Sequence, residues 1–374
     1  MAKEPVLSRY LHAKGKPLGI PISGTFELTA RCNFSCKMCY VRLTQEEQRK
    51  RGRELSAQAW IALAEECKRA GTVFLLLTGG EPTLRPDFPE IYREIMRMGF
   101  IVSVNSNGFL LNGALRELFL ELPPSRLNIS LYGTTDETYE RLCGVPAYST
   151  IWANVNALKA AGVDVRLTMS VTPENAQELR DVCEYARKIG AHVQATTYMF
   201  PPLRRDAQRV GENARLAPET AGHLAAQLDA LTMEPERFRQ RGAVLAQGGQ
   251  PEAADDSCDG AVGSRMLCRA GTTSFWLTWD GRMLPCGQMV TPSFDVTRLG
   301  FAESWRSIRE AGAEIRLPAA CGHCDLARAC HVCAAKCYCE TGHFDGRPSY
   351  LCRMTKQYLQ EVLADWQEKF GGAT

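Results

Sequence analysis

Apolar, β-rich segments alternate with helical patterns from Thr25 to about Tyr198. One of the intervening helices is predicted to begin after Ser56, which can cap it, and to stop at Gly71. Repeated strand and helix units of this kind predict a parallel α/β sheet, and ligands of such sheets collect at the carboxyl ends of the strands. The predicted strands are 24–30, 72–78, 100–105, 126–131, 163–171 and 192–198.

Three cysteines follow the first predicted strand directly. Cys32, Cys36 and Cys39 have C-x3-C-x2-C spacing within the segment Arg31 to Tyr40. Three thiolates on one short loop can hold three irons of a cubane cluster, which leaves the fourth iron without a protein ligand. An open coordination position is typical of a reactive metal site.

Two simpler interpretations compete with a cluster. Structural zinc also favours closely spaced thiolates, although it normally takes four ligands. A disulfide framework is not expected, because the first twenty residues lack a long apolar signal segment and a cytoplasmic chain keeps its thiols reduced. Cys67 and Cys183 fall on the apolar stripes of predicted helices and are expected in the core.

The cysteine array, with Tyr40 after its last cysteine, resembles the cluster-binding loop of the radical S-adenosylmethionine (SAM) enzymes. The resemblance implies a partial (β/α)6 barrel, an open iron that chelates SAM, and reductive cleavage of SAM to a 5'-deoxyadenosyl radical. It also implies SAM contacts at the ends of other strands. These positions are Tyr40, Gly79, Gly80 and Glu81 of a GGEP motif, Asn105, Ser106 and Asn107, Ser130, and Arg141, which could equally be a solvated helix residue.

The carboxyl-terminal part of the chain is rich in cysteine. Ten of the sixteen cysteines lie between Cys258 and Cys352. Asp280 and Gly281 predict a hairpin turn just before Cys286. Repeated C-x2-C pairs are a strong signal for metal ligands. The helical pattern from Met354 to Phe370 is expected to close the chain.

This region resembles the auxiliary-cluster extension called SPASM, with two residues instead of three between the last close pair of cysteines. The resemblance implies two auxiliary 4Fe-4S clusters that relay electrons. The nearer cluster would take Cys258, Cys268, Cys286 and Cys333, and the outer one Cys321, Cys324, Cys330 and Cys352. Cys337 and Cys339 stay unassigned, as spare thiols, alternative ligands or a catalytic acid.

Length and charge set further limits. A chain of 374 residues exceeds what one core usually serves. We predict a lead-in (1–19), a core barrel (20–232), a linker (233–256) and an auxiliary-cluster domain (257–374). The net charge of +2 and the absence of any membrane-length apolar run point to neither nucleic acid nor membrane, and we expect a cytoplasmic protein.

The function expected from these patterns is a radical SAM oxidoreductase that abstracts hydrogen from a substrate carbon. The resemblance favours maturation of a ribosomally made peptide by crosslinking, oxidation or epimerisation, with flavodoxin or ferredoxin as electron donor. A barrel that begins near residue 20 leaves no room for a separate amino-terminal peptide-recognition domain, which favours the alternative of a small-molecule or porphyrin substrate. A non-catalytic iron-sulfur or zinc protein is the more distant alternative.

Overall fold

The structure is a computed structural model and describes residues 6–251, 266 and 268–370. One nine-stranded sheet has the order β6-β5-β4-β3-β2-β1-β7-β8-β9. Strands β1 to β6 are parallel, and all six coincide with the predicted strands within a few residues. The strands are β1 (Ser23–Glu27), β2 (Phe74–Thr78), β3 (Ile101–Ser106), β4 (Arg126–Ser130), β5 (Val165–Ser170), β6 (His192–Thr196), β7 (Ser274–Leu277), β8 (Arg282–Leu284) and β9 (Phe294–Asp295).

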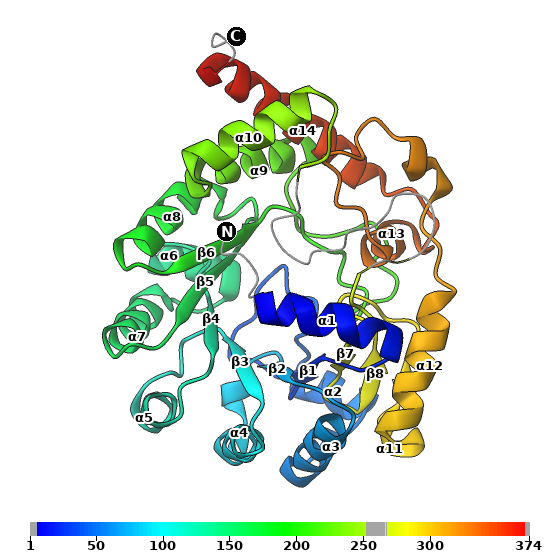
Figure 1. The fold of residues 1–374 in the computed structure, drawn as a ribbon. Coiled ribbons are helices and arrows are strands. Elements are labelled where there is room, and N and C mark those ends of the chain that lie inside the picture. Colours follow the sequence, from blue (N-terminus) through cyan, green and yellow to red (C-terminus); the bar gives the residue numbers. More distant parts are fainter. Residues whose placement is uncertain (1–5, 252–265, 267, 371–374) are drawn as a thin grey trace.

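Helices cover the outer side of the curved sheet, and a further helical layer lies at the β6 end (Figure 1). The helices are α1 (Val6–Leu18), α2 (Gln45–Arg51), α3 (Ala57–Arg69), α4 (Phe88–Arg97), α5 (Gly113–Glu121), α6 (Asp136–Cys143), α7 (Tyr148–Ala160), α8 (Leu179–Lys188), α9 (Pro218–Thr232), α10 (Pro235–Ala246), α11 (Val296–Leu299), α12 (Phe301–Ala313), α13 (Ala334–Thr341) and α14 (Ser349–Phe370). Short 3-10 turns lie at Pro82–Leu84, Ala176–Glu178 and Ala319–His323.

The main core lies between the sheet and its outer helices. Trp60 of α3 and Tyr92 of α4 are fully buried, and the Trp60 ring packs 4.9 Å from the Phe26 ring of β1, measured between centroids. Ser56 caps α3 as predicted, because its hydroxyl accepts from the backbone N–H of Ala59 at 3.2 Å. Cys67 and Cys183 are buried, which confirms their core placement.

Residues 6–18 form helix α1, whereas the sequence suggested only an irregular lead-in. The helix is fixed by tertiary contacts that its weak apolar periodicity did not reveal. His12 hydrogen-bonds the Thr273 hydroxyl at 2.8 Å, and a Cβ at Gly15 would lie 2.7 Å from the Ile22 side chain. Through these contacts α1 covers the amino-terminal ends of β1 and β7.

The predicted linker is also more ordered than expected over its described residues. Residues 235–246 form α10, which packs against α9 and α14. A Cβ at Gly242 would lie 2.2 Å from the Trp366 ring, so glycine permits α10 to approach α14 closely. Within the range predicted as a linker, Gly242 therefore serves helix packing.

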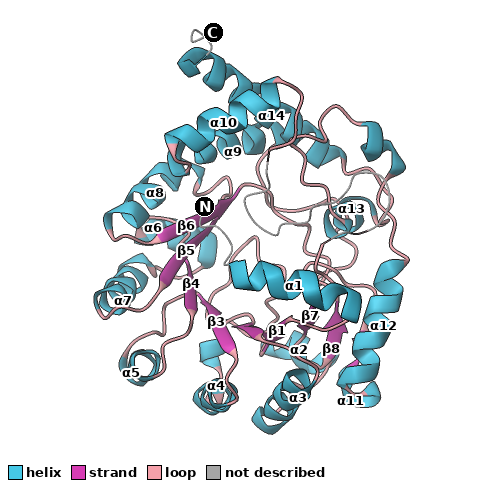
Figure 2. Cartoon of the chain, viewed as in Figure 1, coloured by secondary structure: helices cyan, strands magenta, loops and turns pink. Residues whose placement is uncertain are grey.

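The second module begins within the same sheet. The predicted hairpin is present as β7 and β8, and β7 pairs in parallel with β1, with Ser23 opposite Ser274. The cysteine-rich segment between α12 and α14 consists mostly of loops around the short helix α13 (Figure 2). Among the described residues, no helix has the length and apolar character needed to cross a bilayer.

Candidate functional site

The three-cysteine loop leaves the carboxyl end of β1 and is held against the end of α6. The N–H groups of Ser35 and Lys37 donate to the carbonyls of Cys143 and Leu142 at 2.8 and 3.0 Å. Within the loop, Phe34 N–H lies 3.3 Å from the Cys32 sulfur. Arg42 N–H lies 3.3 Å from the Cys39 sulfur. Backbone donors aimed at sulfur favour bound thiolates.

Burial raises the pKa of the Cys32 thiol to about 12, and the neighbouring Cys36 and Cys39 raise it further. The pKa of Cys36 is raised well above its usual value by a hydrogen bond with Cys143 and by burial. Thiolates in such a place need a compensating cation, so metal binding and deprotonation are coupled. This donor set fits a cluster. Cys143 lies at the end of α6, next to the loop. No local pattern in the sequence marks it as part of this site.

Two buried donors beside the cysteine loop have no hydrogen-bond partner among the described residues. They are the side-chain amide nitrogen Nδ2 of Asn33 and the guanidinium Nε of Arg42. Buried polar groups are normally paired, so these atoms mark places where a ligand can accept a hydrogen bond. Asn33 directly follows Cys32, and Arg42 lies three residues after Cys39. Both positions fit a group bound within the loop.

The GGEP motif lies at the end of β2, against the backbone that leads into the cysteine loop. A Cβ at Gly80 would lie 2.3 Å from the Arg31 carbonyl oxygen, and one at Gly79 would lie 2.6 Å from that of Thr29. Gly80 N–H and Glu81 N–H donate to the Thr29 and Arg31 carbonyls at 2.7 and 2.8 Å. The glycines therefore permit close approach to this backbone.

Glu81 joins three strand ends. Its buried carboxylate accepts four hydrogen bonds. The donors are the Asn107 N–H at 2.7 Å, the Ser106 hydroxyl at 3.0 Å, and both the N–H and the hydroxyl of Thr83. Asn107 in turn donates from its side-chain amide to the Asn33 side chain at 2.8 Å. Burial raises the pKa of Glu81, while these four donors favour its ionised form. The carboxylate thus fixes the polar turn after β3 beside the cysteine loop.

The other residues predicted to contact SAM differ in how far they are buried. Asn105 accepts from the Asn128 side chain at 2.8 Å, and Ser130 is half-buried at the end of β4. Burial raises the pKa of Tyr40. Arg141 is exposed on α6, where it donates to the Thr138 hydroxyl at 2.9 Å. These positions stay predictions as SAM contacts.

A buried ion pair behind Tyr40 was not predicted from the sequence. Arg204 donates to both carboxylate oxygens of Glu27 at 2.6 and 2.7 Å, and the Trp276 indole donates to the same carboxylate at 2.9 Å. The Arg204 guanidinium lies 6.0 Å from the centroid of the Tyr40 ring. This group ties β1, β7 and the segment after β6 to the cysteine loop. The only sign of this ion pair in the sequence is Glu27, the charged residue at the end of β1.

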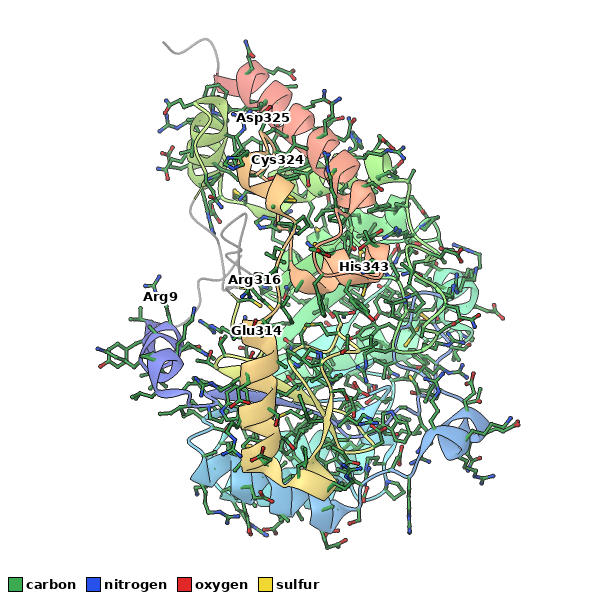
Figure 3. All side chains as sticks on the ribbon, turned by 90° about the vertical axis from the view of Figure 1, so that its right-hand side faces the viewer. Arg9, Glu314, Arg316, Cys324, Asp325 and His343 are labelled. Atoms are coloured by element: carbon green, nitrogen blue, oxygen red, sulfur yellow. The ribbon has the colours of Figure 1, made fainter. Side chains whose placement is uncertain are left out.

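The carboxyl-terminal cysteines gather at two places. The four cysteines of the predicted outer set line one small cavity together with apolar residues; they are Cys321, Cys324, Cys330 and Cys352. Figure 3 labels Cys324 close to α14. This gathering of four thiols fits a fully ligated cluster.

In the nearer set, burial raises the pKa of Cys286 to about 11, with a further contribution from Cys333. Cys268 packs against the same cluster of buried residues as both of them. Cys258 lies outside the described residues. The same buried cluster also contacts Cys321 and Cys330 of the outer set, so the two predicted sets lie against one shared core.

Cys337 and Cys339 are both buried in α13. Burial raises the pKa of Cys337, and its neighbours Cys333, Cys321 and Cys330, which belong to both predicted sets, raise it further. The Cys339 thiol donates to the Gln288 carbonyl at 3.5 Å. The histidines at 323, 331 and 343 are exposed.

A zinc site would need a tight group of ligands. No three His, Cys, Asp or Glu side chains form a group suited to a single metal ion in the part of the chain that the structure describes. Thiolates of a cubane cluster lie farther apart than the ligands of one zinc ion, because each binds a different iron.

The chain is similar in sequence to several known proteins. Residues 26–186 match the family model described as the radical SAM superfamily. An AdoMet-dependent heme synthase of Methanosarcina barkeri is 26% identical over 85% of this chain and 93% of its own length. The sporulation killing factor maturation protein SkfB of Bacillus subtilis is 27% identical over 76% of this chain and 64% of its own length.

A similar fold occurs among solved structures. The structure of native anSMEcpe with bound AdoMet has a TM-score of 0.69, covers 93% of this chain and 99% of that chain, and is 15% identical. At this identity the likeness concerns the fold. The matched family model shows that residues 26–186 form a radical SAM domain, and the cysteine loop at the end of β1 lies within it.

Proposed function

We propose that the chain is a radical SAM enzyme that binds its catalytic 4Fe-4S cluster through Cys32, Cys36 and Cys39. A cluster held there supplies the electron that splits SAM into methionine and a 5'-deoxyadenosyl radical, which removes a hydrogen atom from the substrate. The residues of the chain then have separate tasks. Glu81 fixes the polar turn after β3, and the unpaired donors of Asn33 and Arg42 are placed to bind the cluster or SAM.

Two auxiliary clusters are part of this proposal. The cavity lined by four thiols supports the outer one, and the nearer one is supported by Cys268, Cys286 and Cys333 packing against one buried cluster, which Cys321 and Cys330 also contact. Their role would be to relay an electron during product formation, because full cysteine ligation leaves no iron open to the substrate. Flavodoxin or ferredoxin would serve as the external donor.

For the substrate we propose a tetrapyrrole precursor of heme. The observation that carries this choice is the similarity to the heme synthase, which spans 85% of this chain and 93% of that relative. The second candidate is a ribosomally made peptide, the substrate first expected from the sequence. The similarity to the maturation protein SkfB supports it, over a smaller share of that relative.

The test uses anaerobically reconstituted protein with SAM and a reductant. Formation of 5'-deoxyadenosine is measured by chromatography with each of two substrate panels, carboxylated tetrapyrroles and short peptides. Stimulation by a tetrapyrrole, together with a change in its mass, supports the proposal. Stimulation by peptides alone would favour the second candidate. A protein that forms no deoxyadenosine above background under any condition would refute radical SAM activity.

The metal content provides a separate test. Three clusters correspond to about twelve irons per chain, from three four-iron sites. Replacing Cys32, Cys36 and Cys39 by Ala should remove about four irons and abolish SAM cleavage while the remaining iron stays bound. Zinc in place of iron and sulfide in the anaerobic wild-type protein would contradict the proposal.

A further inference from the structure

A cavity of 150 Å³ lies beside the cysteine loop and is not used by the function proposed above. It is called the rim pocket here, because it lies where the loop after β1 meets the β7–β8 hairpin. Its volume is below that of sites that enclose a whole drug-sized ligand, so it suits one end of a larger molecule. Residues that line it include Val41, Arg51, Arg204, Trp279, Arg282 and Ser293.

The polar lining of the rim pocket is mainly cationic. The guanidinium of Arg51 donates to the backbone carbonyls of Arg204 and Arg205, which fix its position without neutralising its charge. Arg282 adds a second guanidinium from β8. The carboxylate of Asp280 also lines the pocket and accepts from the Thr278 hydroxyl at 2.6 Å. Planar guanidinium groups bind carboxylates with two parallel hydrogen bonds.

Ser293 provides an independent sign of a ligand. Its hydroxyl oxygen is buried and has no hydrogen-bond partner among the described residues. A buried hydroxyl without a partner is costly, and native proteins normally supply one. Since Ser293 lines the rim pocket, an oxygen of a bound molecule can take that place.

The rim pocket shares a wall with the end of the cysteine loop. Val41 lines it and directly follows Tyr40 in the chain. Arg204 lines it from the other side, fixed by Glu27 at the end of β1, with its guanidinium 6.0 Å from the centroid of the Tyr40 ring. A molecule anchored in the rim pocket therefore begins one side chain away from the cysteine loop.

We propose that the rim pocket binds a carboxylate group of the substrate and so holds the rest of the molecule toward the cysteine loop. This inference rests on the proposed function. Arg51 and Arg282 provide the charge, and Ser293 donates its hydroxyl hydrogen. Both substrate candidates carry carboxylates, as tetrapyrrole side chains or as acidic residues and the carboxyl terminus of a peptide.

The test measures binding of propionate to the reconstituted, SAM-loaded protein by calorimetry, with propionamide as its uncharged counterpart. Propionate is expected to bind and propionamide is not. Arg51→Gln should weaken propionate binding by about tenfold or more, the usual effect of losing a charge-assisted hydrogen bond. Ser293→Ala should also weaken it by about tenfold, because its hydroxyl donates to a charged acceptor. Arg49→Gln removes a charge from the same helix outside the pocket and should change nothing.

Displacement of propionate by heme or by a glutamate-rich peptide then distinguishes the two sources of the carboxylate. Iron content and deoxyadenosine formation without substrate are measured for each variant and should equal those of the wild type. The inference is overturned if propionate does not bind, or if both variants bind it as the wild type does. Deoxyadenosine formation by that same protein would leave the proposed function intact, whereas its absence would count against radical SAM activity.

Discussion

Substitution of Gly80 by alanine gives the sharpest test of how the GGEP motif supports the cysteine loop. The new Cβ would lie 2.3 Å from the Arg31 carbonyl oxygen, 2.7 Å from its carbonyl carbon and 2.9 Å from the Ala30 oxygen. All three are backbone atoms, so no side chain can rotate away. The end of β2 must move away from the loop by about 1 Å to restore an ordinary contact.

This movement strains two hydrogen bonds, from Gly80 N–H to Thr29 at 2.7 Å and from Glu81 N–H to Arg31 at 2.8 Å. Each contributes about 1 kcal/mol, and overpacking costs about 1–3 kcal/mol. We therefore expect Gly80→Ala to lower the free energy of unfolding by about 2–5 kcal/mol. The catalytic cluster should be lost, because Glu81 and its contact with Asn107 move together with the strand end.

The assay combines anaerobic urea unfolding, followed by circular dichroism, with iron analysis and deoxyadenosine formation. With the proposed auxiliary clusters in place, Gly80→Ala should retain about eight of about twelve irons, because the cysteines proposed to hold those clusters come from residues 258–352 of the chain. Gly312→Ala, within α12, is the matched control: its Cβ would lie 3.6 Å from the methyl carbon of Met266, an ordinary contact, and alanine favours a helix. A Gly80→Ala protein with wild-type stability, full iron content and normal SAM cleavage would refute this reasoning.

Other substitutions test the buried contacts around the cysteine-rich segment and the core. Glu340→Gln removes the negative charge 2.6 Å from the buried guanidinium of Arg215 and should lower the free energy of unfolding by about 3–5 kcal/mol. Glu219→Gln removes a charge from an exposed pair and should lower it by less than about 1 kcal/mol. Chemical denaturation of the two variants compares these costs. Cys352→Ser should lower the iron content by about four per chain without loss of SAM cleavage in a single turnover, and a protein with unchanged iron would exclude the outer cluster. Tyr92→Phe removes a 2.6 Å hydrogen bond to the carbonyl at the end of α5 and should lower stability by about 1 kcal/mol in the same urea assay; an unchanged midpoint would contradict it.

Local signals in the sequence were sufficient for much of the barrel. The six parallel strands, the capped helix after Ser56 and the hairpin turn at Asp280 and Gly281 all appear in the structure. These features follow from apolar periodicity and from the backbone preferences of a few residues, which act over short distances along the chain. The helix α1 was missed because its contacts with Ile22 and Thr273 lie outside its own sequence.

The candidate site also combines features that the sequence predicts with features that only the structure shows. The spacing of Cys32, Cys36 and Cys39 and the GGEP motif identified the reactive loop, since ligands on one short segment must lie near one another. The pairing of Glu27 with Arg204 joins residues far apart in the chain, and no local pattern marks it.

The sequence by itself thus determined the order of strands and helices and which cysteines could act together, because these depend on neighbours along the chain. Only the tertiary structure decided that β7 extends the barrel sheet beside β1 and that Glu81 joins three strand ends. It also decided that the rim pocket is lined by three arginines and by a serine hydroxyl with no partner among the described residues. These contacts arise from burial and close approach between distant segments, which residue spacing does not encode.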